Sequence, residues 1–460
     1  MPRAVVLIDG EHYPPVVAEA LVSLGREYEV VAAVFLGGTE KIKGDDLQEE
    51  AERLYGVPVV FGPSPTVSLL EAIERFAPAV IVDVSDEPVV GYAERFRLIS
   101  HALSRSVSYA GSDFRFEPPE LPRIACAPSL SIIGTAKRVG KTALSGFVAR
   151  TLQSQRRGRQ QAARVVIVAM GRGGPSEPEV IDGLGVELGA SELLQWSRQG
   201  RHAASDHFED AALSRVTTVG CRRCGGGLAG RPFVSNVAAG AEVANSLKPD
   251  LIVFEGSGAA IPPVATDSRV CVAGAHQPLD YVTGYLGSYR ALISDAVVLT
   301  MAEEPLAGSG NVKEAMRGLA ELVPEVPVLP VVFRPRPMDE VSGKKVAFFC
   351  TAPRALEEVL TSHLEAEHGC RVKLFSPNLS NRRVLREDFG RPEMAEVELV
   401  LTEIKAAAID VVAEEAERRG IPVSFVDNDP VEVAPAKAGD LEALSAYLAD
   451  VARERFTESR

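Results

Sequence analysis

The stretch GTAKRVGKT at residues 134–142 has the residue types of a phosphate-binding loop. The usual loop places four residues between its first Gly and Gly-Lys-Thr, whereas five residues separate Gly134 from Gly140 here. Backbone N–H groups of such a loop, lying between a strand and a helix, bind phosphate oxygens. Lys141 would contact the β- and γ-phosphates and Thr142 would hold Mg²⁺, which predicts a nucleotide site. An ordinary strand-to-helix turn is the alternative. The expected nucleotide contacts are Gly134, Thr135, Gly140, Lys141, Thr142 and Ala143.

The five-residue spacing resembles the loop of dethiobiotin synthetase and related ATP-dependent synthetases, which belong to the deviant Walker A class. Those enzymes carry a similar Glu-Gly-x-Gly after a strand, and its carboxylate binds Mg²⁺. In this chain the strand-like run DLIVFEGSG at 250–258 places Glu255 at that point. The resemblance therefore implies Thr142 and Glu255 as metal ligands. A strand-end Glu that is only solvated is the alternative.

Glycine-rich loops hold the basic residues that an anionic substrate would need. Glycine lets backbone N–H groups approach an anion closely, and Arg binds phosphate with two parallel hydrogen bonds. Such a concentration of cations stands out in a chain whose formal net charge is -14. A flexible, solvated basic loop is the alternative. The candidates are Lys137 and Arg138 in the phosphate loop, Arg172 in MGRGGPSEPEVI, and Arg222, Arg223 and Arg231 in GCRRCGGGLAGRP.

The N-terminal LIDGEHYPP places Asp9 and His12 after a strand-like run, where α/β sheets carry ligand-binding residues. These side chains either line the substrate side of a cleft, or Asp9 caps the following turn and His12 is packed. Both interpretations stay open. The same holds for Lys41 in GGTEK and Lys405 in TEIK, while VDNDP at 426–430 has turn-capping residues.

Cys221 and Cys224 form a single Cys-x-x-Cys pair. A structural zinc site needs a second pair of ligands. His202 and His207 lie upstream, and a symmetric dimer could supply two more thiolates, but one pair is weak support for a metal.

The length and composition of the chain indicate its domain count and its class. A length of 460 residues predicts two or three domains. The acidic charge argues against a nucleic-acid or membrane-surface binder. The sequence shows no signal peptide and no membrane-spanning stretch, and the six sparse cysteines suit reduced thiols, so we expect a cytoplasmic protein. Loop prolines such as Pro262 and Pro263 would suit thermoadaptation.

Apolar runs alternate with helical patterns along the whole chain, which predicts an α/β fold with mostly parallel sheets. We expect an N-terminal α/β domain at 1–125, a phosphate-loop core domain at 126–341 and a C-terminal α/β domain at 342–460. The proline-rich segment 114–129 reads as a linker. Strands are expected at 4–9, 29–38, 57–62, 78–85, 163–170, 250–258, 269–274, 295–300, 326–333 and near 343–353.

Taken together, these segments resemble the cyclic 2,3-diphosphoglycerate synthetase family. The resemblance rests on LIDGEHYPP, GGTEKI, GTAKRVGKTALSG, MGRGGPSEPE, GCRRCGGG, VFEGSGAAIPPV, TEIKAAAIDVV and VDNDP, which span almost the whole chain. It implies that ATP transfers its γ-phosphoryl group to one phosphate of 2,3-bisphosphoglycerate, and that the other phosphate then attacks and closes a cyclic anhydride. Such chemistry depends mainly on positioning and on positive charge. Lys141, Lys137, Arg138 and Arg172 are the expected catalytic cations, and Arg222, Arg223, Arg231, Asp9 and His12 the expected substrate contacts.

Two other functions stay open. One is another phosphate-activating ligase of the dethiobiotin synthetase type, and the other is a nucleotide-switched deviant Walker A ATPase. No partner-binding groove or amphipathic helix of a switch protein is evident. The Asn-Lys-x-Asp guanine signature is absent, which favours ATP, and many deviant Walker A proteins are dimers, so we expect a homodimer.

Overall fold

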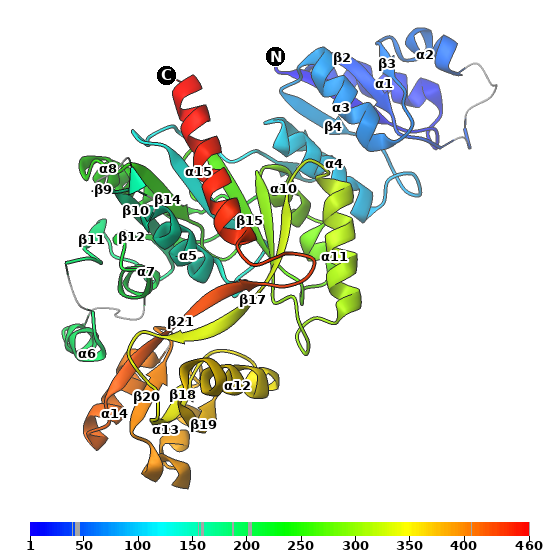
Figure 1. Ribbon diagram of the computed structural model, residues 1–460. Helices are drawn as coiled ribbons and strands as arrows, with labels where there is room; N and C mark the ends of the chain where they lie inside the picture. Colours follow the sequence, from blue (N-terminus) through cyan, green and yellow to red (C-terminus); the bar gives the residue numbers. More distant parts are fainter. Residues whose placement is uncertain are drawn as a thin grey trace. The chain divides into compact units, whose positions relative to one another are not determined.

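The computed structural model describes residues 1–38, 40–41, 47–154, 156–157, 161–185, 188–200, 205–405 and 407–459. The chain forms two compact units, Met1–Pro119 with Leu279–Ile293, and Glu120–Pro278 with Ser294–Arg460. Both contain mostly parallel sheets with helices, which confirms the predicted α/β class (Figure 1). The domain boundaries expected at 125/126 and 341/342 stay a prediction. Within the ranges given, no helix has the length and apolarity needed to cross a membrane.

The first unit is built on a six-stranded sheet of order β3-β2-β1-β4-β5-β6. Its strands are short and apolar, and Ala4–Ile8 of the central strand is fully buried. The strands are β1 (Arg3–Ile8), β2 (Glu29–Phe35), β3 (Val59–Val60), β4 (Val80–Asp83), β5 (Ser108–Ala110) and β6 (Arg115–Phe116). The helices are α1 (Pro14–Leu24), α2 (Leu47–Tyr55), α3 (Pro65–Phe76) and α4 (Tyr92–Ser104).

The expectation of a linker at 114–129 is wrong at its start. Arg115 and Phe116 pair antiparallel with β5 and extend the first sheet. The reason is aromatic packing, because Phe116 lies against Phe96 and Phe114 stacks on Tyr109, with ring centroids 6.0 and 6.2 Å apart. A second segment also joins this unit from far along the chain, namely α9 (Leu279–Val282) and α10 (Gly287–Leu292). There the Ser100 hydroxyl of α4 donates to the carbonyl of Tyr285 at 2.9 Å.

The second unit contains a 13-stranded sheet, whose core half has the order β11-β12-β10-β14-β7-β15-β16-β17. Side chains alternate along each strand, so one face of the sheet packs against α5 and α15 and the other face packs against α8. The core strands are β7 (Ser129–Gly134), β10 (Val165–Gly171), β11 (Glu179–Ile181), β12 (Thr217–Cys224), β13 (Val234–Ser235), β14 (Leu251–Glu255), β15 (Ser268–Gly274), β16 (Ala296–Thr300) and β17 (Val328–Pro337). The helices are α5 (Lys141–Ser154), α6 (Ala190–Arg198), α7 (Asp206–Ser214), α8 (Val237–Ser246), α11 (Ser309–Leu322) and α15 (Asp440–Glu458), and a small hairpin joins β8 (Arg156–Arg157) to β9 (Gln161–Ala162).

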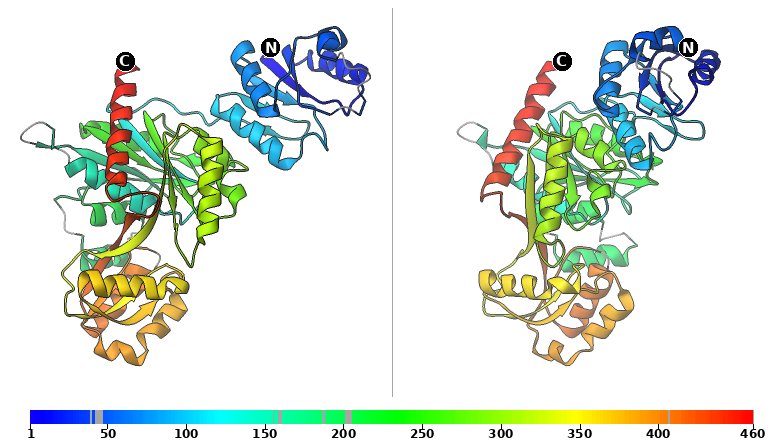
Figure 2. Two further views of the ribbon diagram at one scale, coloured as in Figure 1. Left: turned by 45° about the vertical axis from the view of Figure 1, so that its right-hand side comes forward. Right: turned by 90° about the vertical axis from the view of Figure 1, so that its right-hand side faces the viewer.

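A long antiparallel pair carries this sheet into a C-terminal lobe. Residues 331–337 of β17 pair with 426–432 of β21 (Val423–Glu432), and the two strands run together from the core to the lobe in both views (Figure 2). The lobe adds β18 (Lys345–Phe349), β19 (Arg371–Ser376) and β20 (Leu399–Thr402), with α12 (Glu357–His368), α13 (Arg382–Phe389) and α14 (Glu414–Arg419). One apolar cluster joins Leu193 of α6 and Phe208 of α7 to Phe349 and Phe389 of the lobe, so these two core helices pack against it.

Candidate nucleotide and metal site

The phosphate loop has the strand, loop and helix order that its sequence predicts. β7 ends at Gly134, and α5 begins at Lys141. Gly140 has φ of +89°, and a Cβ there would lie 2.2 Å from the ring of Phe333, so only glycine fits. The Thr135 hydroxyl donates to Oε1 of Gln277 at 2.6 Å, which anchors the start of the loop to the segment after β15. The loop therefore has a defined path between fixed ends.

The additional loop residue coincides with an exposed basic tip. Lys137 and Arg138 are exposed, and Arg138 has a φ of +63°. The Arg138 guanidinium donates to the hydroxyl of Ser380 in the C-terminal lobe at 3.3 Å. The tip of the loop thus reaches the lobe as well as the site.

Lys141 is buried inside the loop. Its ammonium group donates to the carbonyl of Ala136 at 2.8 Å. Burial lowers the pKa of Lys141 to about 8, although the charges of Glu255 and Asp206 oppose that shift. A buried cation of this kind gains stabilisation when an anion binds beside it.

Glu255 lies beside the phosphate loop because β14 is the direct neighbour of β7, with Glu255 paired to Ile132. The Thr142 hydroxyl donates to Oε1 of Glu255 at 2.6 Å. The other oxygen, Oε2, is buried and has no hydrogen-bond partner among the described residues. Both carboxylate oxygens of Asp210 in α7 are also buried and have no hydrogen-bond partner among the described residues. Burial is the main cause that raises the pKa of Glu255 to about 7, and burial with the nearby charge of Glu255 raises the pKa of Asp210.

These acceptors without donors fit a divalent cation. Mg²⁺ prefers oxygen ligands and keeps several of its ligands as water or substrate phosphate. In the described part of the chain, no group of three or more His, Cys, Asp or Glu side chains is arranged to hold a metal. Thr142, Glu255 and Asp210 therefore form a partial ligand set of the kind that Mg²⁺ uses together with nucleotide phosphates.

Asp210 was missed from the sequence, and a signal for it was present. The stretch SDHFEDAALS at 205–214 places Asp206, Glu209 and Asp210 at i, i+3 and i+4, which is one face of a helix. Nothing in that pattern says that the face points at the phosphate loop.

Two of the predicted cations converge over Gly258. A Cβ at Gly258 would lie 2.7 Å from Nη2 of Arg172 and 3.1 Å from Nη2 of Arg223. Arg223 donates to the carbonyls of Gly225 and Ser257 at 2.6 and 2.7 Å. Burial and the charge of Arg172 both lower the pKa of Arg223. Neither guanidinium forms an ion pair with a carboxylate among the described residues, and the nearby charge of Asp206 only partly offsets the positive charge of the pair.

The remaining predicted residues are not gathered at this point. The side chains of Arg222 and Arg231 are exposed on their loops, and the backbone N–H of Arg222 donates to Asn236. Asp9 lies in the first unit, fully buried. It accepts hydrogen bonds from the backbone N–H groups of Glu11, His12 and Asp86 and from Nδ1 of His12, at 2.7–3.2 Å. This geometry supports the turn-capping interpretation of Asp9.

Among the described residues, the Cys-x-x-Cys pair is not joined by further side chains that would complete a zinc site. Cys221 is buried between β12 and α8, where burial raises its pKa to about 12, while Cys224 is exposed. Nδ1 of His207 lies 2.9 Å from the hydroxyl of Ser205 instead of near the thiols. His202 lies outside the described residues.

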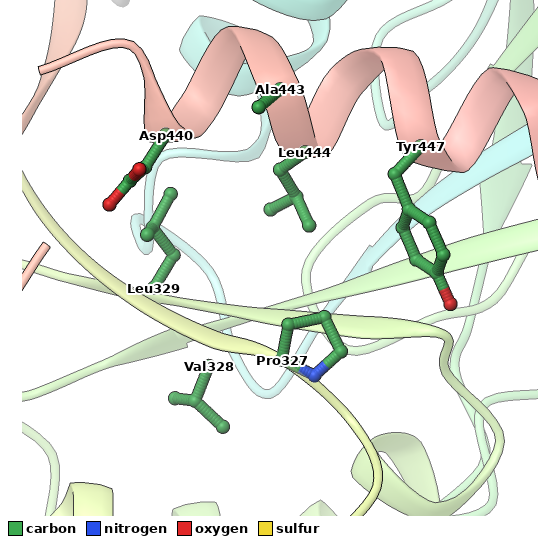
Figure 3. Close-up of a pocket in the computed structure, with 7 residues that line it drawn as sticks. All are labelled: Pro327, Val328, Leu329, Asp440, Ala443, Leu444 and Tyr447. Atoms are coloured by element: carbon green, nitrogen blue, oxygen red, sulfur yellow. The ribbon is translucent and has the colours of Figure 1, made fainter. Parts of the chain in front are cut away.

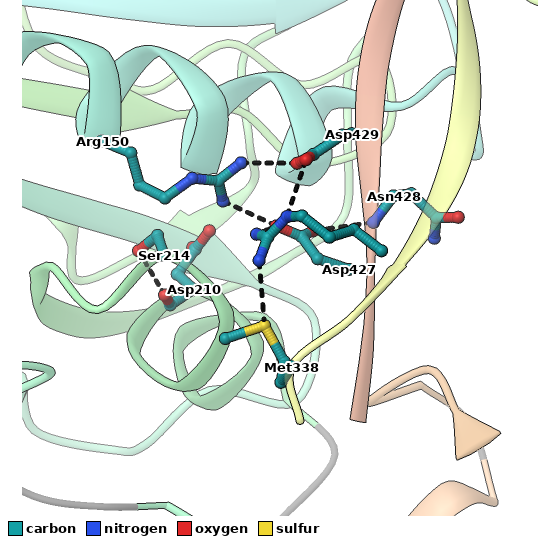
Figure 4. Close-up of polar contacts among 8 residues, drawn as sticks. Arg150, Asp210, Ser214, Met338, Asp427, Asn428 and Asp429 are labelled. Atoms are coloured by element: carbon teal, nitrogen blue, oxygen red, sulfur yellow. Dashed lines mark hydrogen bonds and ion pairs between the residues drawn. The ribbon is translucent and has the colours of Figure 1, made fainter. Parts of the chain in front are cut away.

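An ion-pair cluster lies next to Asp210 (Figure 4). Arg150 of α5 donates to Asp427 and Asp429 of β21 at 2.6 and 2.7 Å, and Arg336 of β17 donates to the same two carboxylates. A small cavity is lined by Thr142, Asp210 and Asp427, among others, and lies next to this cluster. The helix that follows the phosphate loop is thereby tied to the strands that lead into the lobe.

A separate groove lies between β17 and α15 (Figure 3). Its lining is mainly apolar and contains none of the predicted site residues. It is formed by Pro327, Val328, Leu329, Asp440, Ala443, Leu444 and Tyr447.

Known protein families and individual proteins match this chain over almost its whole length. Family models described as the N-terminal, P-loop and C-terminal domains of cyclic 2,3-diphosphoglycerate synthetase match residues 3–117, 129–332 and 337–429. The cyclic 2,3-diphosphoglycerate synthetase of Rubrobacter xylanophilus is 54% identical over 433 residues, covering 93% of this chain and 94% of that protein. That of Methanothermus fervidus is 42% identical over 464 residues, covering 100% and 99%. The synthetase of Thermococcus gammatolerans is 47% identical and covers 93% and 94%. The chain is an enzyme with a P-loop domain, and it belongs to the cyclic 2,3-diphosphoglycerate synthetase family.

Proposed function

We propose that the protein uses ATP to close 2,3-bisphosphoglycerate into its cyclic anhydride, with release of ADP and phosphate. The observation that carries this proposal is the juxtaposition at the carboxyl edge of the core sheet. A phosphate loop with a buried Lys141 lies beside carboxylate oxygens that lack donors, and two guanidiniums converge at Gly258, one of which lowers the pKa of Lys141. Family membership supports the choice of substrate.

The reaction divides into two displacements. An oxygen of one substrate phosphate attacks the γ-phosphorus of ATP, and the bond to ADP breaks. An oxygen of the other substrate phosphate then attacks the phosphorus that was modified, and the transferred phosphoryl group leaves as inorganic phosphate. The attacking oxygens are already anionic near neutral pH, so the protein needs to supply alignment and positive charge more than a base.

Each role has a candidate in the described chain. The loop N–H groups and Lys141 hold the β- and γ-phosphates of ATP, while Arg172 and Arg223 hold the substrate phosphates against their mutual repulsion. Thr142, Glu255 and Asp210 would hold Mg²⁺, which when bound neutralises phosphate charge. Lys137 and Arg138 at the loop tip, with Arg222 and Arg231, stay candidates for further phosphate contacts. We also propose that the protein is cytoplasmic and forms a homodimer. Sedimentation at twice the mass of one chain would support the dimer.

Phosphorus NMR tests the reaction directly. Purified protein is incubated with ATP, Mg²⁺ and 2,3-bisphosphoglycerate, beside a Lys141→Ala variant. Upfield anhydride signals of a cyclic product, together with ADP and phosphate, are expected with the native protein and absent with the variant. ATP that stays intact, or that is hydrolysed equally without the bisphosphate, would exclude ring closure. Carboxylate and amine acceptors would then test the alternative ligase function.

A further inference from the structure

Lys405 lies among carboxylates that come from three different elements. Its ammonium group is 3.1 Å from Oε1 of Glu209 in α7. Glu403, which follows β20, and Asp427 of β21 are the other nearby charges. Burial disfavours the charge of Lys405, but these three carboxylates outweigh it and raise its pKa. The lysine thus connects α7 of the core with two strands of the C-terminal lobe.

Glu209 depends on this lysine more than the other two carboxylates do. Glu403 accepts hydrogen bonds from the backbone N–H and hydroxyl of Thr351 and from the amide of Asn428, at 2.7–2.8 Å. Asp427 is paired with two arginines. In the part of the chain that the structure describes, Lys405 is the cation within ion-pair distance of Glu209, whose side chain is only 8% exposed. A buried carboxylate that loses its cation is strongly disfavoured.

Glu209 directly precedes Asp210, the carboxylate that faces Glu255. The same helix packs through Phe208 into the apolar cluster shared with the lobe. Its C-terminal turn packs through Leu213 into the same cluster, and the helix also contacts α5, β10 and β12. The Glu209–Lys405 ion pair is one of the contacts that set the rotation of α7 about its axis, and it acts on the residue next to Asp210.

We infer that Lys405, through its ion pair with Glu209, is a positioning residue of the C-terminal lobe that holds Asp210 against Glu255 and Thr142 for metal binding. This inference rests on the metal site proposed above. Lys405 touches neither nucleotide nor metal in this scheme. Its loss acts through α7, as when the partners that orient metal ligands are removed.

The test measures how strongly Mg²⁺ tightens nucleotide binding, without turnover. A non-hydrolysable ATP analogue is titrated calorimetrically into the full-length protein, once in EDTA and once in Mg²⁺, and the ratio of the two affinities is the readout. Lys405→Met should reduce that ratio about tenfold or more, the effect usual for residues that orient metal ligands. The affinity of the Lys405→Met variant for the analogue in EDTA should stay at the native value, because the phosphate loop is intact.

Matched variants separate positioning from a loss of folding. The double variant Glu209→Gln with Lys405→Met leaves no unpaired buried charge, so it should regain stability, but its ratio should stay low because the ion pair is still absent. Glu417→Gln breaks the exposed Arg198–Glu417 pair, which also joins a core helix to the lobe at 2.5 Å, and should change nothing. Should Lys405→Met fail to fold by circular dichroism, Glu209→Gln alone must lower the ratio in the same direction.

A native ratio in both single variants would overturn the inference, as would a double variant that regains the native ratio. If the native protein binds the analogue equally in EDTA and Mg²⁺, the proposed metal site fails and this inference fails with it. A native protein that responds to Mg²⁺ beside variants that respond equally would overturn the positioning role alone.

Discussion

Asp9 and Glu255 occupy equivalent places in two sheets. Asp9 directly follows a buried parallel strand, and Glu255 is the last residue of another. Each precedes a glycine, and each is almost completely buried. The oxygens of Asp9 accept four hydrogen bonds from its own and a neighbouring loop. Glu255 accepts one, from Thr142, and its second oxygen has no partner in the described chain.

The contrast separates two uses of a strand-end acid. A carboxylate whose acceptor positions are filled holds loops together, and its charge is stabilised by the donors around it. A buried carboxylate with an unfilled position, next to a second carboxylate and a phosphate loop, is costly unless a cation binds. The number of filled acceptor positions, rather than burial or location, distinguishes the two acids.

The largest expected effect concerns Glu255. Glu255→Gln keeps the side-chain volume and the bond from Thr142 but removes the charge that a metal requires. We expect turnover to fall by about 10²–10³-fold, the scale of losing one electrostatic contact in the transition state. The unfolding midpoint should stay at or above the native value, because repulsion with Asp210 is relieved. A variant with native turnover would remove the contrast with Asp9.

Asp9→Asn should show the reverse pattern. Loss of the charge weakens several hydrogen bonds within the first unit, and we expect about 2 kcal/mol less stability, the usual value for bonds to a charged group. Denaturant unfolding measures this change. The affinity for an ATP analogue should be unchanged, and a large loss of nucleotide affinity with native stability would place Asp9 in the site after all.

The converging arginines give a third test. Arg223→Ala should raise the KM for 2,3-bisphosphoglycerate about tenfold or more while the KM for ATP changes little, because one charge-assisted contact to phosphate is removed. Arg222→Ala is the matched control, since this neighbour on β12 is exposed and is expected to have a much smaller effect. Equal effects of the two variants would mean that the loop acts only through its overall charge.

The smallest expected effect concerns His101 in the first unit. Burial, with the charges of Arg105 and Arg97, lowers the pKa of His101 from 6.5 to about 4. Between these values the unfolded chain binds a proton that the folded chain does not, so stability is lost as the pH falls below 6.5. At pH 5 the loss should be about 1–2 kcal/mol. His101→Gln should flatten the pH dependence of the unfolding midpoint. An unchanged slope would contradict the assignment.

Much of the fold and of the nucleotide site was predictable because the signals are local. Apolar runs marked the buried strands, and Gly134, Gly140, Lys141 and Thr142 stand close together in the chain at a strand-to-helix junction. The resemblance implied Glu255 and Thr142 as metal ligands at the phosphate loop, and the structure brings the two within hydrogen-bond distance.

Only the tertiary structure decided the rest. Arg222 and Arg223 are adjacent in sequence, and their different exposure follows from the alternation of side chains along β12. Asp210 lies in the helix beside the phosphate loop, and Lys405 lies at Glu209, because α7 packs against both the phosphate-loop helix and the C-terminal lobe. The sequence by itself determined which segments become strands, helices and a phosphate loop. It did not determine which helix face meets that loop, because the same periodic pattern is compatible with many packings, and the free energy that selects one comes from contacts between residues far apart in the chain.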